Sequence, residues 1–136
     1  MNTEDARRLA IEYGLSGPSW ALDPNKHISE ILSQIKSSGG CGPGKIGDYL
    51  VPDTIWGLNI KPACYIHDCR YSIIEAINGT HETKRNMKYS ADKELFDNID
   101  KIIYLKSNWI MRLIRRRVAL VYFDAVDFGG EAFVSS

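Results

Sequence analysis

Residues 62–71 read PACYIHDCRY, and the fold that the sequence predicts is built around this stretch. Pro62 suits the first turn of an α-helix, because the N–H that proline lacks would be unpaired there anyway. The apolar residues that follow recur at helical spacing as far as Asn78-Gly79, a pair typical of a turn. The sequence therefore predicts a helix that carries a His-Asp pair near its middle.

The polar residues of this helix point in two directions. His67 and Tyr71 are four residues apart and share a face, with Cys64 close to it. Asp68 is rotated from His67 by about 100°. One helix can thus aim an imidazole at one target and a neighbouring carboxylate at another.

The rest of the chain is also helical in pattern and predicts an all-α fold. Apolar residues at helical spacing predict four further helices. These are Thr3–Tyr13, His27–Lys36, one from Thr83 or Lys84 to a break at Ser107-Asn108, and one over Ile110–Ala125 that ends at Gly129-Gly130. The short turn at Asn78-Gly79 makes the third and fourth helices antiparallel neighbours.

The segment Ser37–Asn59 differs from the rest, because it contains six glycines and two prolines. So many breakers exclude a long regular element, although a short strand fits Tyr49–Val51. Long ordered loops in compact domains are usually functional. The carbonyl oxygens of Gly40, Gly42 and Gly44 could converge on a cation, since glycine backbone turns freely.

Two carboxylates complete the candidate site. Ca2+ binds six to eight oxygens, including backbone carbonyls, and needs a carboxylate for charge, which Asp68 could supply. Asp92 interrupts the apolar stripe of the fourth helix, and a buried carboxylate needs a partner. His67 is the obvious partner, because an Asp on one imidazole nitrogen fixes the tautomer and leaves the other nitrogen free to deprotonate water.

These residues resemble the phospholipase A2 superfamily, most closely its bacterial and fungal branch. The family's catalytic helix carries a Cys three residues before a His-Asp pair and a Tyr four residues after the His. The matching residues are Cys64, His67, Asp68 and Tyr71. The family's calcium loop has the form X-Cys-Gly-X-Gly, which Gly40–Gly44 match.

The resemblance extends beyond this helix and loop. The family's next helix carries an Asp that binds the catalytic His, and Asp92 is similarly placed. Ala125–Gly129 resembles the segment that ends the bacterial and fungal members, so the resemblance covers roughly Gly39–Gly130. Many secreted members carry cysteines where this chain has Ala63 and Arg70, so their dense set of disulfides is missing.

The resemblance implies an activity as well as a fold. The implied single domain over 1–136 has N-terminal helices in 1–38, a calcium-binding loop region in 39–60 and a helical catalytic core in 61–130. The implied activity is Ca2+-dependent hydrolysis of the sn-2 ester of glycerophospholipids, with His67 as the base, in a secreted or virion-associated protein. A Cys41–Cys64 bridge would tie the loop to the catalytic helix.

Each assignment has a plainer alternative. His67 also fits a structural histidine, and Tyr71 fits a core aromatic residue. Asp68 and Asp92 also fit ordinary surface acids. The glycine loop also fits a bare connector or an anion-binding nest, and Cys64 or Cys69 near the histidine fits a thiol nucleophile. The whole chain also fits a related module that has lost turnover and binds membranes or a partner, or a hydrolase of other esters.

Composition and charge narrow the range of functions that the chain can have. Lys plus Arg equals Asp plus Glu at 17 each, which argues against a general nucleic-acid binder. The glycine loop lacks the Gly-Lys-Ser/Thr ending of a nucleotide-binding P-loop. No stretch is apolar enough to cross a bilayer, and the charged Met1–Ala10 does not fit a signal peptide. Three cysteines allow at most one internal bridge.

The positive charges are unevenly placed along the chain. Trp109 is followed in the last predicted helix by a basic cluster of Arg112, Arg115, Arg116 and Arg117. The cluster fits a docking patch for the anionic headgroups of a phospholipid membrane surface. It fits the solvated face of a helix equally well.

Overall fold

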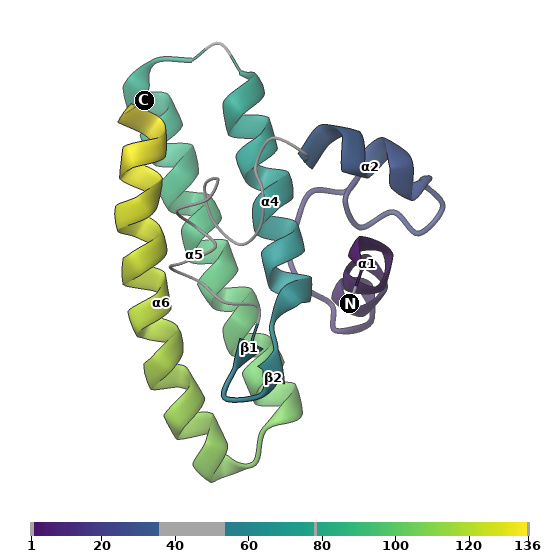
Figure 1. Cartoon of the computed structure of the whole chain (residues 1–136), viewed down its shortest axis with the longest axis vertical. Helices are drawn as coiled ribbons and strands as arrows, with labels where there is room; N and C mark the ends of the chain where they lie inside the picture. The colour runs from purple at the N-terminus through teal and green to yellow at the C-terminus, as the bar shows by residue number, and fades with distance from the viewer. Residues whose placement is uncertain (1, 36–53, 78, 136) are drawn as a thin grey trace.

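The computed structural model describes residues 2–35, 54–77 and 79–135, which form five helices and one small two-stranded sheet (Figure 1). The elements are α1 (Thr3–Glu12), α2 (Ile28–Ile35), β1 (Thr54–Ile55), β2 (Leu58–Asn59), α4 (Lys61–Ala76), α5 (His81–Lys106) and α6 (Trp109–Ser135). The described chain is therefore mostly helical, as the apolar spacing predicted.

Short polar side chains set the starts of three helices. Asn2 caps α1, since its Oδ1 accepts a hydrogen bond of 2.8 Å from the Asp5 N–H. Thr80 caps α5 in the same way, and its Oγ1 accepts from the Thr83 N–H at 3.1 Å. Asn108 Oδ1 accepts from the Met111 N–H at 2.9 Å near the start of α6. The Thr80 cap explains why α5 begins earlier than the predicted Thr83 or Lys84.

A β-hairpin precedes α4, and the sequence did not predict it. β1 pairs antiparallel with β2, with Ile55 opposite Leu58. The two residues between them, Trp56 and Gly57, have φ of 47° and 77°. Positive φ at both central residues is typical of a type I′ turn, whose twist suits a two-residue hairpin. The strand predicted at Tyr49–Val51 lies outside the described residues.

The last helix is longer than predicted. The sequence predicted an end at Gly129-Gly130, but α6 continues through both glycines to Ser135. Glycine in a helix costs about 1 kcal/mol relative to alanine, so it weakens a helix without forbidding it. The prediction of this helix end was wrong.

The three long helices pack in sequence order. α5 packs against both α4 and α6, while α1 and α2 pack against α4. Figure 1 shows α4 and α5 running antiparallel, with α6 along the far side of α5. The hairpin lies at the same end of the molecule as the turn between α5 and α6 (Figure 1). The two helices predicted to carry the His-Asp site are thus neighbours.

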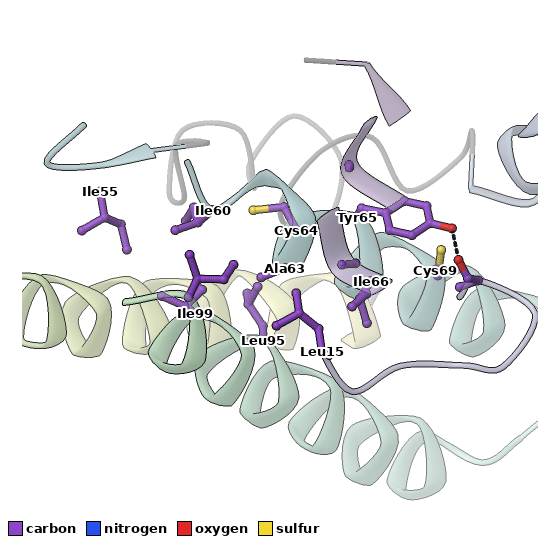
Figure 2. Packing of buried hydrophobic residues seen from close by; sticks show 14 of the residues in the cluster. Leu15, Ile55, Ile60, Ala63, Cys64, Tyr65, Ile66, Cys69, Leu95 and Ile99 are labelled. Atoms are coloured by element: carbon purple, nitrogen blue, oxygen red, sulfur yellow. Dashed lines mark hydrogen bonds between the residues drawn. The ribbon is translucent and has the colours of Figure 1, made fainter. Parts of the chain in front are cut away.

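The main core lies where α1, α4, α5 and the hairpin meet (Figure 2). Its members include Ala6, Ala10, Ile55, Ile60, Ala63, Ile66, Leu95, Ile99 and Ile102. The segment after α1 approaches α4 closely, because a Cβ placed on Gly17 would lie 2.9 Å from Cγ2 of Ile66. Nearby, the buried Tyr65 hydroxyl donates a hydrogen bond to the Ala21 carbonyl, the dashed contact in Figure 2. The core therefore packs α4 against α1, α5 and the hairpin.

Candidate active site

His67 is fully buried in the middle of α4, with 1% of its surface exposed. Its Nε2 lies 2.8 Å from Oδ1 of Asp92 on α5. Two antiparallel helices therefore bring together residues 25 positions apart in the sequence. The interhelical contact expected from the sequence is present.

Three side chains surround the buried carboxylate of Asp92. The Tyr71 hydroxyl donates to Oδ1 at 2.6 Å, beside His67 Nε2. Nζ of Lys88, one turn earlier on α5, lies 3.1 Å from Oδ2 in an ion pair. With a hydroxyl donating to Oδ1 and an ammonium in an ion pair with Oδ2, the carboxylate acts as an acceptor. His67 Nε2 therefore carries the ring hydrogen, which leaves Nδ1 with a lone pair.

Nδ1 of His67 is the atom that faces away from this network. It is buried and has no hydrogen-bond partner among the residues that the structure describes. A buried polar atom of this kind usually binds water or a ligand. The imidazole ring therefore offers Nδ1 as a base.

Tyr71 combines the two roles that the sequence left open. Its side chain is buried with Ile74 and Ala91 in a small apolar cluster. Its ring centroid lies 4.3 Å from that of His67, with the two planes tilted by 41°. Because its hydroxyl also binds Asp92, Tyr71 supports both members of the His-Asp pair.

Asp68 follows His67 on α4 and is partly exposed, although its Oδ1 oxygen is buried. It does not contribute to the hydrogen bond between His67 and Asp92. The donor chemistry of a carboxylate fits calcium. The described residues contain no group of three His, Cys, Asp or Glu that could hold a metal ion. The other predicted ligands, Gly40, Gly42 and Gly44, lie outside the described residues.

The cysteines do not support a thiol nucleophile at Cys69. This thiol is free and fully buried, and burial raises its pKa to about 12, with the Asp68 carboxylate adding to the rise. The reactive thiolate is thus strongly disfavoured. Cys64 is buried on α4, and its predicted partner Cys41 lies outside the described residues. The predicted Cys41–Cys64 bridge therefore stays a prediction.

The arginines of α6 contact neighbouring parts of the protein. Arg112 lies over the Tyr104 ring, 4.3 Å from its centroid. Arg115 donates to the Ser107 hydroxyl at 2.7 Å and to the Trp56 carbonyl at 2.8 Å.

Arg116 and Trp109 differ in their surroundings. Arg116 forms an ion pair of 2.5 Å with Asp100. Trp109, the predicted aromatic anchor, is 70% exposed. The contacts of Arg112, Arg115 and Arg116 therefore stabilise the turn between α5 and α6, and the same arginines supply positive charge there.

A cavity of about 410 Å³ opens between α4 and α5, but it is separate from the candidate site. It is lined by Arg70, Ile73, Ile74, Asn86, Met87, Ser90, Ala91 and Glu94. None of His67, Asp68 and Asp92 belongs to this lining. The cavity therefore gives no support to the predicted chemistry.

Sequence reasoning missed two residues. Lys88 precedes Asp92 by four positions, a spacing that brings opposite charges together on a helix, but it resembled an ordinary surface lysine. Trp56 sits at the tip of an unpredicted hairpin and is 62% exposed. Only packing between distant segments reveals that one is buried and the other exposed.

Comparisons with known proteins leave the family open. No family model, curated protein or solved structure matches this chain. Among the described residues, no helix is both long and apolar enough to span a bilayer. The function must therefore be argued from the site itself.

Proposed function

We propose that the protein is a calcium-dependent phospholipase of the A2 type, which hydrolyses the sn-2 ester of glycerophospholipids to a fatty acid and a lysophospholipid. One observation carries the proposal: the buried pair of His67 and Asp92, with Nδ1 of His67 unpartnered among the described residues. The spacing of Cys64, His67, Asp68 and Tyr71, which resembles that of the phospholipase A2 superfamily, supports it further.

His67 acts as the general base in the proposed reaction. Asp92 accepts a hydrogen bond from the Nε2–H and so fixes the tautomer and the orientation of the ring. The lone pair on Nδ1 takes a proton from water, which attacks the ester carbonyl. The imidazolium that results is stabilised by the carboxylate at 2.8 Å. No covalent acyl-enzyme is needed.

Asp68 would supply the carboxylate that holds calcium. Carbonyl oxygens of Gly40, Gly42 and Gly44 are the proposed neutral ligands. When bound, calcium supplies positive charge that polarises the ester carbonyl and stabilises the oxyanion. The neighbouring positions of His67 and Asp68 on α4 would place the base and the metal carboxylate on adjacent sides of one helix.

The first experiment measures fatty-acid release from mixed liposomes with calcium and with a chelator. We expect His67→Ala to lower the rate at least about 100-fold, the usual scale of general-base catalysis. His81→Ala is the matched control, because His81 is exposed at the start of α5, away from Asp92. Release that continues in a folded His67→Ala variant contradicts the assignment.

A second pair of variants tests the metal assignment. Asp68→Asn should weaken calcium binding in calorimetry and lower fatty-acid release, because the site loses its carboxylate charge. Asp97→Asn is the control, since Asp97 is exposed on α5. Unchanged calcium affinity in Asp68→Asn would refute the role of Asp68 as a ligand.

A binding module that has lost turnover is the second candidate. Its support is the exposure of Trp56, Tyr104 and Trp109, which does not require catalysis. The retained His67–Asp92 pair counts against it. Liposome binding without fatty-acid release at any calcium concentration would favour this candidate.

We also propose that the enzyme docks on anionic membranes through this aromatic surface, here called the tryptophan end. It consists of the exposed residues Trp56, Tyr104, Leu105, Trp109, Ile110 and Leu113. Arg115 links its two parts, since it binds both the Trp56 carbonyl and the Ser107 hydroxyl. Tryptophan suits the membrane–water interface.

Charge favours an anionic surface as the partner of the tryptophan end. Residues 100–117 contain six Lys or Arg and one Asp, a net charge of +5 in a chain whose net charge is zero. Each cation near an anionic bilayer contributes about 1 kcal/mol. The proposed partner is therefore a phospholipid surface that carries negative charge.

A further inference from the structure

Lys88 is a charged side chain in the interior of the protein. Its side chain is 1% exposed, and Nζ lies 3.1 Å from Oδ2 of Asp92, whose side chain is fully buried. The two residues are four positions apart on α5, so they lie one turn from each other on the same face. Asp92 is shared by this ion pair and by the contact with His67.

Burying an ammonium group is costly. Even a paired buried charge often stabilises a protein less than an apolar side chain of the same volume. A lysine can usually extend its head to water, which Lys88 does not do. Methionine would fill much of the same space without the charge. Packing alone therefore does not explain a lysine at this position.

The surroundings of the second carboxylate oxygen of Asp92 explain the buried lysine better. Oδ1 accepts from His67 Nε2 and from the Tyr71 hydroxyl, while Oδ2 faces the Lys88 ammonium. The ammonium lies 3.1 Å from Oδ2 and supplies a counter-charge to the carboxylate in the interior. This ion pair opposes rotation of the carboxylate away from the imidazole.

We propose that Lys88 is a positioning residue for the base His67, and that it acts through Asp92. Its ammonium group holds Oδ2 by charge and thereby keeps Oδ1 in line with Nε2 of the imidazole. The proposal rests on the proposed function, because it assigns Lys88 a role in the same reaction. A salt bridge with a structural role only would stabilise the fold but leave the imidazole unaffected.

Two substitutions separate these roles. Lys88→Met removes the donor and the charge at similar volume, whereas Lys88→Gln removes the charge but keeps a donor. Lys93→Met and Lys93→Gln are the matched controls, since Lys93 is exposed on the same helix. Circular dichroism and urea unfolding establish which variants are folded.

The first readout is kinetic, on dispersed short-chain substrate. We expect kcat to fall at least tenfold in Lys88→Met and at least threefold in Lys88→Gln, with KM within twofold of the parent. A structural role predicts lower stability with the parent kcat. If Lys88→Met does not fold, Lys88→Gln decides the question.

The second readout is the proton NMR signal of the His67 Nε2–H, which lies far downfield when the ring donates to a carboxylate. We expect this signal to shift or broaden in each folded Lys88 variant and to stay unchanged in the Lys93 controls. A folded Lys88 variant with the parent kcat and the parent signal overturns the proposal. Failure of the proposed function is distinguishable, since an inactive parent still gives the NMR signal.

Discussion

A single carboxylate, that of Asp92, organises the polar interior of this protein. It receives His67 and Tyr71 from α4 and Lys88 from its own helix. Leaving a buried charged group without its partners costs several kcal/mol, so each of these residues constrains the others. The orientation of the imidazole therefore depends on side chains from both helices.

Cys69 is the second informative single residue, because its pKa makes stability depend on pH. Burial raises the pKa of the folded thiol to about 12, whereas the pKa of an unfolded thiol is about 8.5. Between these values the unfolded chain loses a proton that the folded chain keeps. The unfolded state then binds fewer protons, so stability falls as pH rises, by up to about 1.4 kcal/mol per pH unit.

We therefore expect Cys69→Ala to be less sensitive to alkali than the parent. Between pH 8 and pH 10 the parent should lose about 2 kcal/mol more unfolding free energy than the variant. Urea unfolding of both proteins at the two pH values measures this difference. Equal losses would show that the Cys69 thiol titrates alike in the folded and unfolded states.

At the scale of elements, the hairpin and the corner between α5 and α6 form one surface. Arg115 joins them, Arg112 packs on Tyr104 and Arg116 pairs with Asp100. Arginines that brace a corner are poor probes of membrane binding, because their replacement also disturbs the corner. The exposed tryptophans Trp56 and Trp109 are better probes.

We expect Trp56→Ser with Trp109→Ser to weaken binding to anionic vesicles at least tenfold, a change of about 1.4 kcal/mol. Hydrolysis of dispersed short-chain substrate should be unchanged, since neither residue is near His67 in the chain or hydrogen-bonds with it. Tyr89→Ser is the control, because Tyr89 is 53% exposed on α5 but about 22 Å along the helix from Tyr104. Co-sedimentation at low salt measures the binding.

The outcome at the tryptophan end is decisive in both directions. Parent-like binding by the double variant would show that docking occurs elsewhere on the surface. Equal loss in Tyr89→Ser would show that any exposed aromatic residue contributes. Binding to zwitterionic vesicles with the same affinity would contradict the role of the net positive charge.

A second contact between elements ties the segment after α1 to α5. The Asn98 side chain accepts a hydrogen bond of 3.0 Å from the Ser16 N–H and donates one of 2.8 Å to the Ser16 carbonyl. Asn98 is 3% exposed, so this amide replaces a backbone partner in the interior. Both backbone groups of Ser16 depend on it.

Asn98→Ala should therefore lower the free energy of unfolding by about 2 kcal/mol, since it leaves two polar groups without these partners. Asn86→Ala, at an exposed site of the same helix, should change it by less than about 0.5 kcal/mol. Urea unfolding monitored by circular dichroism measures both. A loss in Asn98→Ala no larger than in Asn86→Ala would mean that water replaces the amide.

At the scale of the whole molecule, stability comes from packing across α1, α4 and α5. Arg70 forms a two-bonded ion pair with Glu94 at 2.9 and 3.0 Å. The hydrogen bonds that Arg70 donates to the Glu94 carboxylate raise the pKa of Arg70. An ion pair thus links α4 to α5 outside the apolar core.

The Cys41–Cys64 bridge is a prediction about the whole chain. We expect Cys41 and Cys64 to be joined in protein prepared under oxidising conditions, because Cys69 is free and only three cysteines exist. Mass spectrometry of non-reduced peptides identifies the linkage. A Cys41–Cys69 linkage, or three free thiols in oxidised protein, would contradict the proposed register of the glycine loop.

The sequence by itself determined the helical class, the approximate bounds of the helices and the faces of α4 that carry His67 and Asp68. These follow from local rules, since helix periodicity relates residues three or four positions apart. It also indicated Asp92 as the partner of His67, because an acid in an apolar stripe needs one.

Only the tertiary structure decided that Lys88 is buried, that Trp56 joins Trp109 at one end and that the arginines of α6 bind other elements. These features depend on contacts between segments far apart in the chain, which local periodicity does not specify. The continuation of α6 through Gly129-Gly130 also departs from the local preference of glycine.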